Sequence, residues 1–199
     1  MNELSLDEKL RAAHTKRWQI VNVGRTQSMA EHAFLVQIIA IEVARTIGWS
    51  NERSGPFNIE KEFDIMRWAL WHDMLEVRTG DLNTPTKIKL KAMVGGDAVD
   101  IIEKDISAEY EKIKQSTFDP TKVIVKLADY IEAVRFLDEE GKGSHAAEVR
   151  ATVAGQLRRH FEGVCRMSSL MSLDWHRLRP MIDALTGTAS GGDVAPSIE

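Results

Sequence analysis

The chain has few of the features that mark secreted, membrane-spanning or zinc-finger proteins. Its 199 residues include a single cysteine, Cys165, which excludes an internal disulfide and a finger-type thiolate zinc site. No apolar run approaches the roughly 18 residues that a membrane span needs. The first ten residues lack the basic and apolar pattern of a signal peptide. We therefore expect a cytoplasmic protein that does not contact a membrane.

An excess of positive charge is absent as well. Lysine and arginine number 26 against 30 aspartates and glutamates, which gives a formal net charge of −4. This balance provides no electrostatic reason to expect a nucleic-acid partner. A slightly acidic enzyme that acts on an anionic substrate must concentrate positive charge locally, or supply it with a metal ion.

Hydrophobic periodicity predicts helices along nearly the whole chain, and no segment reads as a convincing strand. Hydrophobic residues make up 43% of a chain long enough to bury one core, so we expect a single all-α domain over residues 1–186. The predicted helices are a short one from Ser5 towards His14, one from after Gly96 to Ile113, and those over 29–45, 59–77, 121–137, 144–170 and 173–186. Capping boxes are expected at Ser5 and Ser28. Residues 187–199 are predicted to be a disordered tail.

Three of these helices carry a metal-capable residue on an apolar face. His32 has apolar residues at i−3, i+3, i+4 and i+7, so its imidazole is predicted to point into the core. His72, Asp73 and Asp129 also have apolar residues one helical turn away. A buried carboxylate is costly unless it is paired or coordinates a cation. The pattern therefore points to a shared ion.

Two imidazoles and two carboxylates suit a divalent ion such as Zn, Co, Mn or Ni, with water in the open positions. Neighbouring residues on a helix point about 100° apart, so His72 and Asp73 reach one ion only if it lies between their directions. Glu76, one turn further on, could orient the attacking water or move its proton.

Ordinary structural explanations compete with this interpretation. A single histidine on an apolar face is more often a hydrogen-bonded core residue, and Glu76 could face solvent. Asp129 could pair with Lys126 or Arg135. The joint pattern favours a metal centre, because His, His-Asp and Asp follow one another on separate apolar helices.

That ordered pattern resembles the signature of the HD-domain superfamily of metal-dependent phosphohydrolases. The segments that resemble its YfbR-like 5′-deoxynucleotidases are Arg17-Trp18, Glu31-His32, the run HDMLEVRTGDLNTPTK over 72–87, and Lys126-Leu127-Ala128-Asp129. The resemblance covers roughly residues 10–140. It departs at Asn83, where the family commonly has a second proline. A compact chain of this kind also resembles the phage-encoded HD triphosphohydrolases that act on dATP.

The resemblance implies an HD-type helical bundle and a role for each matching residue. The residues that would bind the metal are His32, His72, Asp73 and Asp129. The acid–base pair would be Glu76 and Asp81. The residues that would bind phosphate oxygens are Arg17, Lys87 and Lys126, and those that would enclose the sugar and base are Trp18, Ile20 and Pro85. Apart from the resemblance, Trp18 could equally pack in the core, and Arg17 and Lys87 could be ordinary surface charges.

The leading hypothesis is a metal-dependent enzyme that hydrolyses 2′-deoxynucleoside 5′-monophosphates at the phosphorus. A second hypothesis within the family is a triphosphohydrolase that converts dATP to deoxyadenosine and triphosphate, and both enzymes share the motifs above. An HD enzyme for another phosphoester and a non-catalytic helical module that binds nucleotides are two further hypotheses. The presence of all four ligands with Glu76 and Asp81 argues against the module. Family members are usually oligomeric, so we expect a homo-oligomer.

Overall fold

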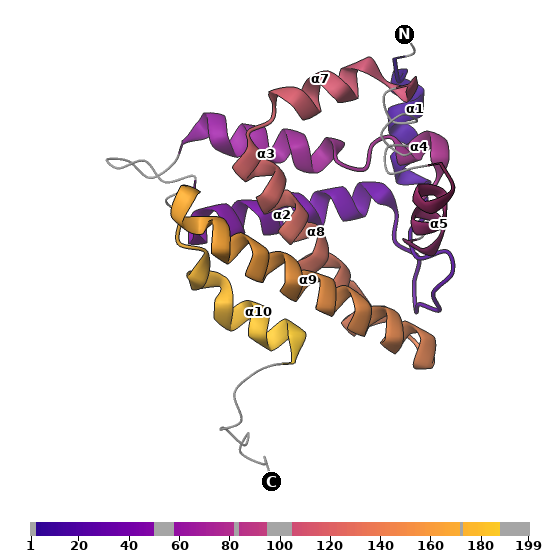
Figure 1. Cartoon of the computed structure of the whole chain (residues 1–199). Coiled ribbons are helices and arrows are strands. Elements are labelled where there is room, and N and C mark those ends of the chain that lie inside the picture. Colours follow the sequence, from indigo (N-terminus) through magenta and orange to yellow (C-terminus); the bar gives the residue numbers. More distant parts are fainter. Residues whose placement is uncertain (1–2, 50–57, 82–83, 95–104, 172, 188–199) are drawn as a thin grey trace.

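All regular structure in the described part of the chain is helical (Figure 1). The computed structural model describes residues 3–49, 58–81, 84–94, 105–171 and 173–187. The helices are α1 (Leu6–Leu10), α2 (Met29–Thr46), α3 (Ile59–Trp71), α4 (Glu76–Thr79), α5 (Thr84–Val94), α7 (Ala108–Ser116), α8 (Asp119–Glu140), α9 (Gly143–Met171) and α10 (Arg179–Thr186), with 3-10 turns at Arg11–Ala13 and Trp175–Leu178. Within these ranges the only strand-like pairings are the isolated bridges Lys16–Ser28 and Val23–Gly141. The predicted all-α fold is confirmed.

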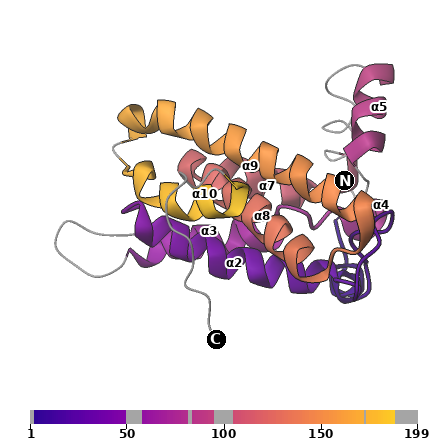
Figure 2. The same cartoon turned by 90° about the horizontal axis from the view of Figure 1, so that it is seen from below.

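Helix α8 is the centre of the molecule. It packs against α2 and α3 and also against α9, and α10 in turn packs on α9. Figure 2 shows α2 and α9 on opposite sides of it. The helix is therefore buried around most of its circumference, with Ile124, Leu127 and Ile131 at most 1% exposed. Any polar residue on α8 that faces α2 or α3 must find a partner inside the bundle.

Side-chain caps set where several helices begin. Ser28 accepts a hydrogen bond from the backbone N–H of Glu31 at the start of α2, and Asn58 does the same for Lys61 at the start of α3. The capping box predicted at Ser5 is present. At Ser28 only its first half forms, because the Glu31 carboxylate pairs with Arg25 at 2.6 Å instead of returning to the backbone.

The predicted continuous helix over 59–77 is wrong at residues 72–75. Helix α3 ends at Trp71, and tight turns follow in which the backbone N–H of Met74 donates to Trp71 and that of Glu76 donates to Asp73. Helix α4 then begins at Glu76. Apolar residues continue through this break because they still pack into the core, so periodicity alone did not reveal it. The break matters because His72 and Asp73 lie within it.

Helix α5 was not predicted. Pro85 lies in the first turn of α5 (Thr84–Val94). Proline is well tolerated there because its missing N–H would have no intrahelical partner. Figure 2 shows α5 extending away from the bundle beside α4.

Other predictions fall partly outside the described residues. The helix expected from after Gly96 to Ile113 is described from residue 105, and there it is interrupted at Ser107, whose extended backbone caps the start of α7. Of the predicted tail, only Gly187 is described, so the boundary at 186 stays a prediction. No helix in the described part of the chain combines the length and apolarity that crossing a bilayer requires.

Candidate metal centre

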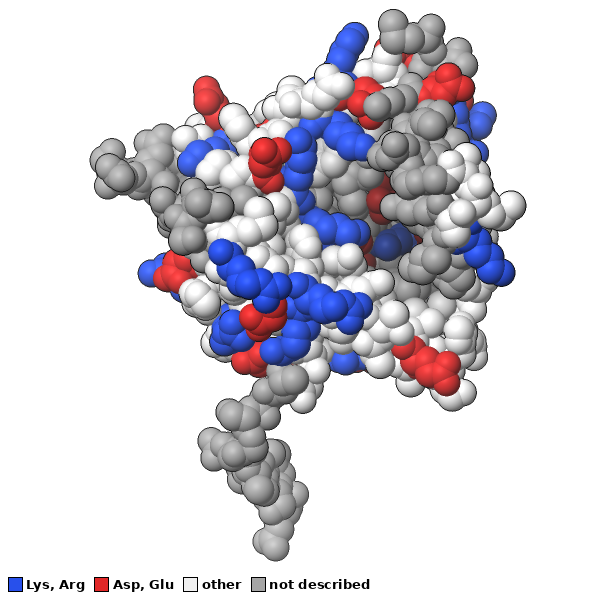
Figure 3. All heavy atoms as spheres, viewed as in Figure 1, with Lys and Arg blue, Asp and Glu red and all other residues white. Residues whose placement is uncertain are grey.

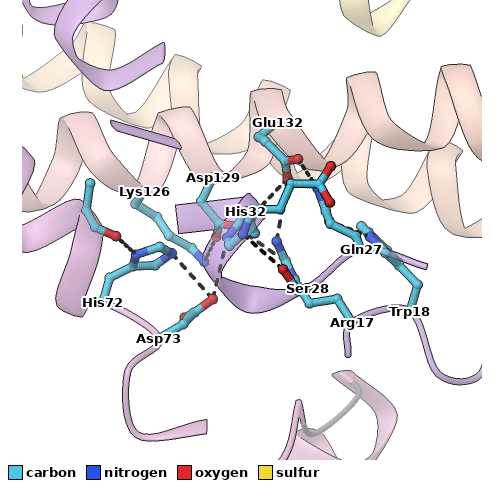
Figure 4. A network of polar contacts seen from close by, with 12 residues as sticks. Arg17, Trp18, Gln27, Ser28, His32, His72, Asp73, Lys126, Asp129 and Glu132 are labelled. Atoms are coloured by element: carbon cyan, nitrogen blue, oxygen red, sulfur yellow. Dashed lines mark hydrogen bonds and ion pairs between the residues drawn. The ribbon is translucent and has the colours of Figure 1, made fainter. Parts of the chain in front are cut away.

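The four predicted metal ligands meet at one point, as Figure 4 shows. Helix α2 supplies His32, the turn after α3 supplies His72 and Asp73, and α8 supplies Asp129. The Nε2 atom of His32 lies 3.4 Å from Oδ1 of Asp129 and 3.6 Å from Oδ2 of Asp73. Nε2 of His72 lies 3.4 Å from the same Asp73 oxygen. Ligand atoms of His32, His72 and Asp129 all lie within 4.8 Å of one another.

The two histidines present the atoms that a metal ion needs. In each ring Nδ1 has a partner: Glu132 Oε2 at 2.7 Å from His32, and the carbonyl oxygen of Ala69 at 2.7 Å from His72. Both Nε2 atoms are buried without a hydrogen-bond partner among the described residues. A hydrogen bond donated by Nδ1 leaves the Nε2 lone pair available as a ligand. Two such nitrogens beside carboxylate oxygens fit a divalent cation.

The four side chains of His32, His72, Asp73 and Asp129 form a cluster, and the charge of this cluster leads to the same conclusion. Burial lowers the pKa of His32, as does Arg17, but the adjacent carboxylates of Asp129, Asp73 and Glu132 raise it to about 10. Burial lowers the pKa of His72 below its usual value, which keeps that ring neutral. The carboxylates therefore favour one additional positive charge at this point, which either a proton or a cation can supply.

Asp129 has two different roles for its two oxygens. Oδ1 faces His32, whereas Oδ2 accepts a hydrogen bond from Lys126 Nζ at 2.7 Å. The pairing with Lys126 that competed with the metal hypothesis is thus present together with the cluster. Burial raises the pKa of Asp129, but Lys126, His32 and Arg17 lower it well below its usual value. The side chain is a carboxylate, as a metal ligand must be.

A lysine-lined pocket opens beside the cluster. It has a volume of about 260 Å³, and its walls include His72, Asp73, Lys114, Lys122 and Lys126. Figure 3 shows basic side chains gathered beside a hollow on this face. Lys126 was predicted to bind phosphate, but Lys114 and Lys122 were not. The position of Lys122, four residues before Lys126 on the same helix face, was a signal that could have found it.

The loop over 15–28 forms the opposite side of the site. Its ends are joined by a hydrogen bond from the backbone N–H of Arg17 to the carbonyl of Gln27. A second pocket, of about 370 Å³, includes Arg17 and Trp18 in its wall. In Figure 4, His72 and Lys126 lie on one side of His32 and Asp129, and Trp18 lies on the other.

Arg17 and Trp18 are held firmly in this loop. The Arg17 guanidinium lies 3.5 Å from Glu132 and 3.8 Å from Asp129. Burial lowers its pKa, but the carboxylates around it, Asp81 among them, raise the pKa above its usual value. Arg17 is therefore not an ordinary surface charge. Trp18 stacks on Phe136 with a centroid separation of 5.7 Å, so core packing explains one face of its ring.

The structure describes the remaining predicted site residues in less detail. Glu76 begins α4 and is partly buried, as is Asp81. Ile20 is 53% exposed and is absent from the walls of both pockets. The side chains of Pro85 and Lys87 lie outside the described residues.

Two further residues of the site, besides Lys114 and Lys122, were not predicted from the sequence: Glu132 and Gln27, which are 3% and 0% exposed. Glu132 contacts His32, and Gln27 donates a hydrogen bond from Nε2 to Glu132 Oε1. The signal for Glu132 was its position three residues after Asp129, on the same face of an otherwise apolar helix. No comparable signal marked Gln27, which lies in a loop.

Comparison with known proteins identifies the family. The family model described as 5′-deoxynucleotidase YfbR-like matches residues 9–147. The chain belongs to this family of HD phosphohydrolases. The matched segment contains the whole metal cluster and both pockets, and it ends shortly after α8.

Curated relatives of this HD phosphohydrolase carry two activities. The dATP triphosphohydrolase of Salmonella phage PMBT28 is 39% identical over 139 residues, which cover 69% of this chain and 68% of the relative. That of cyanophage S-2L is 32% identical over 153 residues, 76% and 80% of the two chains. The 5′-deoxynucleotidase ECA3034 of Pectobacterium atrosepticum is 25% identical over 141 residues, 64% and 68% of the chains.

A solved structure resembles the whole enzyme. It is the cyanophage S-2L HD phosphohydrolase DatZ, bound to dA and one catalytic Zn²⁺ ion, with a TM-score of 0.73 and 25% sequence identity. The match covers 95% of this chain and all of that one. A divalent metal in the relative agrees with the His-His-Asp cluster found here.

Proposed function

We propose that this enzyme hydrolyses 2′-deoxynucleotides at the α-phosphorus and releases the deoxynucleoside. The observation that carries the proposal is the position of the metal cluster between two pockets of different character. An α-phosphate bound at the cluster would extend its nucleoside towards Trp18 and any further phosphates towards the lysines. The relatives' activities on dATP and on deoxynucleotides support this orientation.

His32, His72, Asp73 and Asp129 would hold the divalent ion. When bound, such an ion supplies positive charge to the phosphoryl oxygens and acidifies a water molecule. Of the candidate ions Zn, Co, Mn and Ni, zinc is the first to test because the solved relative holds Zn²⁺.

The enzyme's own side chains would manage the remaining charge and protons. Arg17, with Lys126 and Lys87, would bind phosphate oxygens, where fixed cations stabilise the charge that develops in the transition state. Glu76 would accept a proton from the attacking water as its oxygen bonds to phosphorus. Asp81 would protonate the 5′-oxygen as the phosphorus–oxygen bond breaks.

The nucleoside would lie on the Trp18 side of the cluster. Close approach of the Trp18 ring to the sugar would leave no room for a 2′-hydroxyl, and would thereby select deoxyribose. Ile20 and Pro85 would complete the enclosure of the base. An aromatic side chain is a suitable surface for a nucleobase because every base has a π-face.

Two substrates fit this proposal. A monophosphate needs only the cations next to the cluster, and Lys114 and Lys122 would then have no phosphate to bind. Their presence in the pocket wall is a specific observation in favour of a triphosphate. The higher identity to the two phage dATP triphosphohydrolases supports the same choice. We therefore take dATP as the first substrate to test and dAMP as the second.

Separation of the products by anion exchange tests the proposal. Metal-loaded protein is incubated with dATP, dAMP and ATP, and we expect deoxyadenosine together with triphosphate or phosphate, and little turnover of ATP. Binding of a nucleotide without any turnover would instead indicate the non-catalytic module and would refute the proposal. Turnover restricted to phosphoesters other than deoxynucleotides would indicate an HD enzyme with a different substrate.

We also propose that the enzyme is a homo-oligomer that acts in the cytoplasm, in a host cell if the chain is phage-encoded. Large apolar side chains on α2 and α3 support self-association: Phe34, Ile38, Phe63, Met66 and Leu70 are 44–63% exposed. Light scattering after size exclusion would measure the mass of the assembly, and a monomeric mass at micromolar concentration would contradict the proposal.

A further inference from the structure

A continuous line of hydrogen bonds joins Trp18 to the metal ligand His32. The indole Nε1–H of Trp18 donates to Oε1 of Gln27 at 3.0 Å. The Nε2 group of the same Gln27 donates to Oε1 of Glu132. Oε2 of Glu132 lies 2.7 Å from Nδ1 of His32. Figure 4 shows this line extending from Trp18 to the centre of the cluster.

Which group donates and which accepts in each of these hydrogen bonds follows from the negative charge of Glu132. A carboxylate can only accept hydrogen bonds. Glu132 therefore requires that Nδ1 of His32 carries a proton and that the Nε2 amide group of Gln27 faces its other oxygen. The carbonyl oxygen of Gln27 is then left facing Trp18, where it can accept the indole N–H. Gln27 and Glu132 are 0% and 3% exposed, so water does not compete for these bonds. A change of orientation at one end would leave a buried polar group unpaired at the other.

The backbone of Trp18 shows that this orientation is imposed. Its φ is +61°, the only positive value at a non-glycine among the described residues. A bulky residue in the left-handed region is held there at a steric cost. The hydrogen bond to Gln27 and the stacking on Phe136 are the contacts that offset this cost.

We propose that Gln27 is a positioning residue that couples Trp18 to the metal ligand His32 through Glu132. Metal binding and nucleoside binding then strengthen each other, because each fixes one end of the same line. The inference that Trp18 contacts the nucleoside rests on the proposed function, whereas the coupling between Trp18 and the metal does not. The two parts can therefore be tested separately.

The first test measures Co²⁺ binding in the absence of any nucleotide. Removing a hydrogen-bond partner of a metal-bound histidine typically weakens metal affinity about 10–100-fold. Gln27→Met keeps the length of the side chain and removes both of its hydrogen bonds, so we expect a loss of about tenfold and a changed visible Co²⁺ spectrum. Trp18→Phe keeps an aromatic ring and removes only the indole N–H, so we expect a smaller loss of several-fold.

Two matched variants control for the loss of the same groups elsewhere. Trp49→Phe removes an indole N–H that has no partner among the described residues. Gln115→Met removes an exposed amide on α7. Both should bind Co²⁺ as the unaltered protein does. Wild-type affinity and spectrum in both Gln27→Met and Trp18→Phe would overturn the coupling, and Trp18→Phe alone decides the matter if Gln27→Met does not fold.

The second test measures the affinity for deoxyadenosine with and without Zn²⁺. Coupling between two sites is reciprocal and typically changes affinity about 5–150-fold. We expect Zn²⁺ to tighten deoxyadenosine binding at least fivefold in the unaltered protein and in Gln115→Met, and by a clearly smaller factor in Gln27→Met. An equal factor in all three would overturn the role of Gln27 in nucleoside binding. Failure of every protein to bind deoxyadenosine would refute the nucleoside position assigned in the proposed function, while the Co²⁺ result would still stand.

Discussion

Replacing Lys114 and Lys122 by methionine should separate triphosphate from monophosphate recognition. Both side chains line the pocket beside His72 and Asp73, and about a third of each is exposed. Each also has an acidic neighbour on its own helix, Glu111 at 4.0 Å from Lys114 and Asp119 at 3.2 Å from Lys122. Part of each positive charge is therefore already compensated before a substrate binds.

The expected loss follows from the distance dependence of charge interactions. Two unit charges 4 Å apart attract by about 1 kcal/mol in water and by about 4 kcal/mol in a typical protein surface environment. Partial exposure and the acidic neighbours place these lysines near the lower value, at about 1–1.4 kcal/mol each. The double substitution should therefore lower kcat/KM for dATP about 30- to 100-fold, since 1.4 kcal/mol corresponds to a factor of ten. For dAMP, whose single phosphate would lie at the cluster, the loss should stay below about threefold.

The assay compares kcat/KM for dATP and dAMP at one metal concentration. If dAMP is not turned over, its inhibition constant against dATP replaces its kcat/KM. Lys112→Met is the matched control, because Lys112 is exposed on the same helix as Lys114 and does not line the pocket. Equal losses for both nucleotides, or no loss for dATP, would refute the assignment of this pocket to the outer phosphates.

Other perturbations address the cluster and its surroundings. Asp129→Ala should abolish both metal content and turnover, and retention of both in metal analysis and product assays would contradict the ligand set. Glu76→Gln should lower kcat about 10²–10⁴-fold with metal content unchanged, and an unaltered kcat would exclude Glu76 as the proton acceptor. Trp18→Ala should raise KM about tenfold or more through the loss of stacking, and an unchanged KM would remove Trp18 from the nucleoside site. Because the pKa of His32 is raised to about 10 in metal-free protein, metal must displace a proton below that pH. Metal affinity should therefore rise about tenfold per pH unit between about pH 7 and 9, and calorimetry in two buffers should detect release of about one proton.

The composition and periodicity of the sequence were sufficient to predict the helical class, and the four residues that they singled out lie close together in the structure, while their role as metal ligands stays a prediction. Their proximity has a physical reason: a histidine or carboxylate among apolar residues on a helix must be paired or coordinated, and the pattern is visible in one dimension. His32 and Asp129 are buried as the pattern predicted. The prediction required no knowledge of how the helices pack.

The turn at His72 and Asp73 shows where periodicity stops being informative. On a continuous helix the two side chains would diverge by about 100°. Instead, α3 ends at Trp71, and the tight turns that follow place Asp73 Oδ2 3.4 Å from His72 Nε2. Buried apolar residues look the same in sequence whether they lie in a helix or in a turn, so the break depended on tertiary packing.

Residues outside the helices were harder to predict for a different reason. Gln27 lies in a loop, where no repeating pattern distinguishes a buried amide from an exposed one. Its burial depends on contacts with Glu132, which is 105 positions away in the chain. Lys114 similarly became part of a pocket only through the packing of α7 beside α3. Such long-range contacts cannot be read from local composition.

The origin of the cluster in distant segments has a consequence for the lifetime of the protein. Glu132 and His32 are 100 positions apart, and the site cannot exist until α8 has docked on α2. A metal ion that binds only the docked state stabilises it, by about 2.7 kcal/mol at a free concentration one hundred times Kd. When the ion is scarce, a larger fraction of molecules would therefore open and be degraded by proteases. The supply of metal would set how much of the enzyme persists as well as how fast it works.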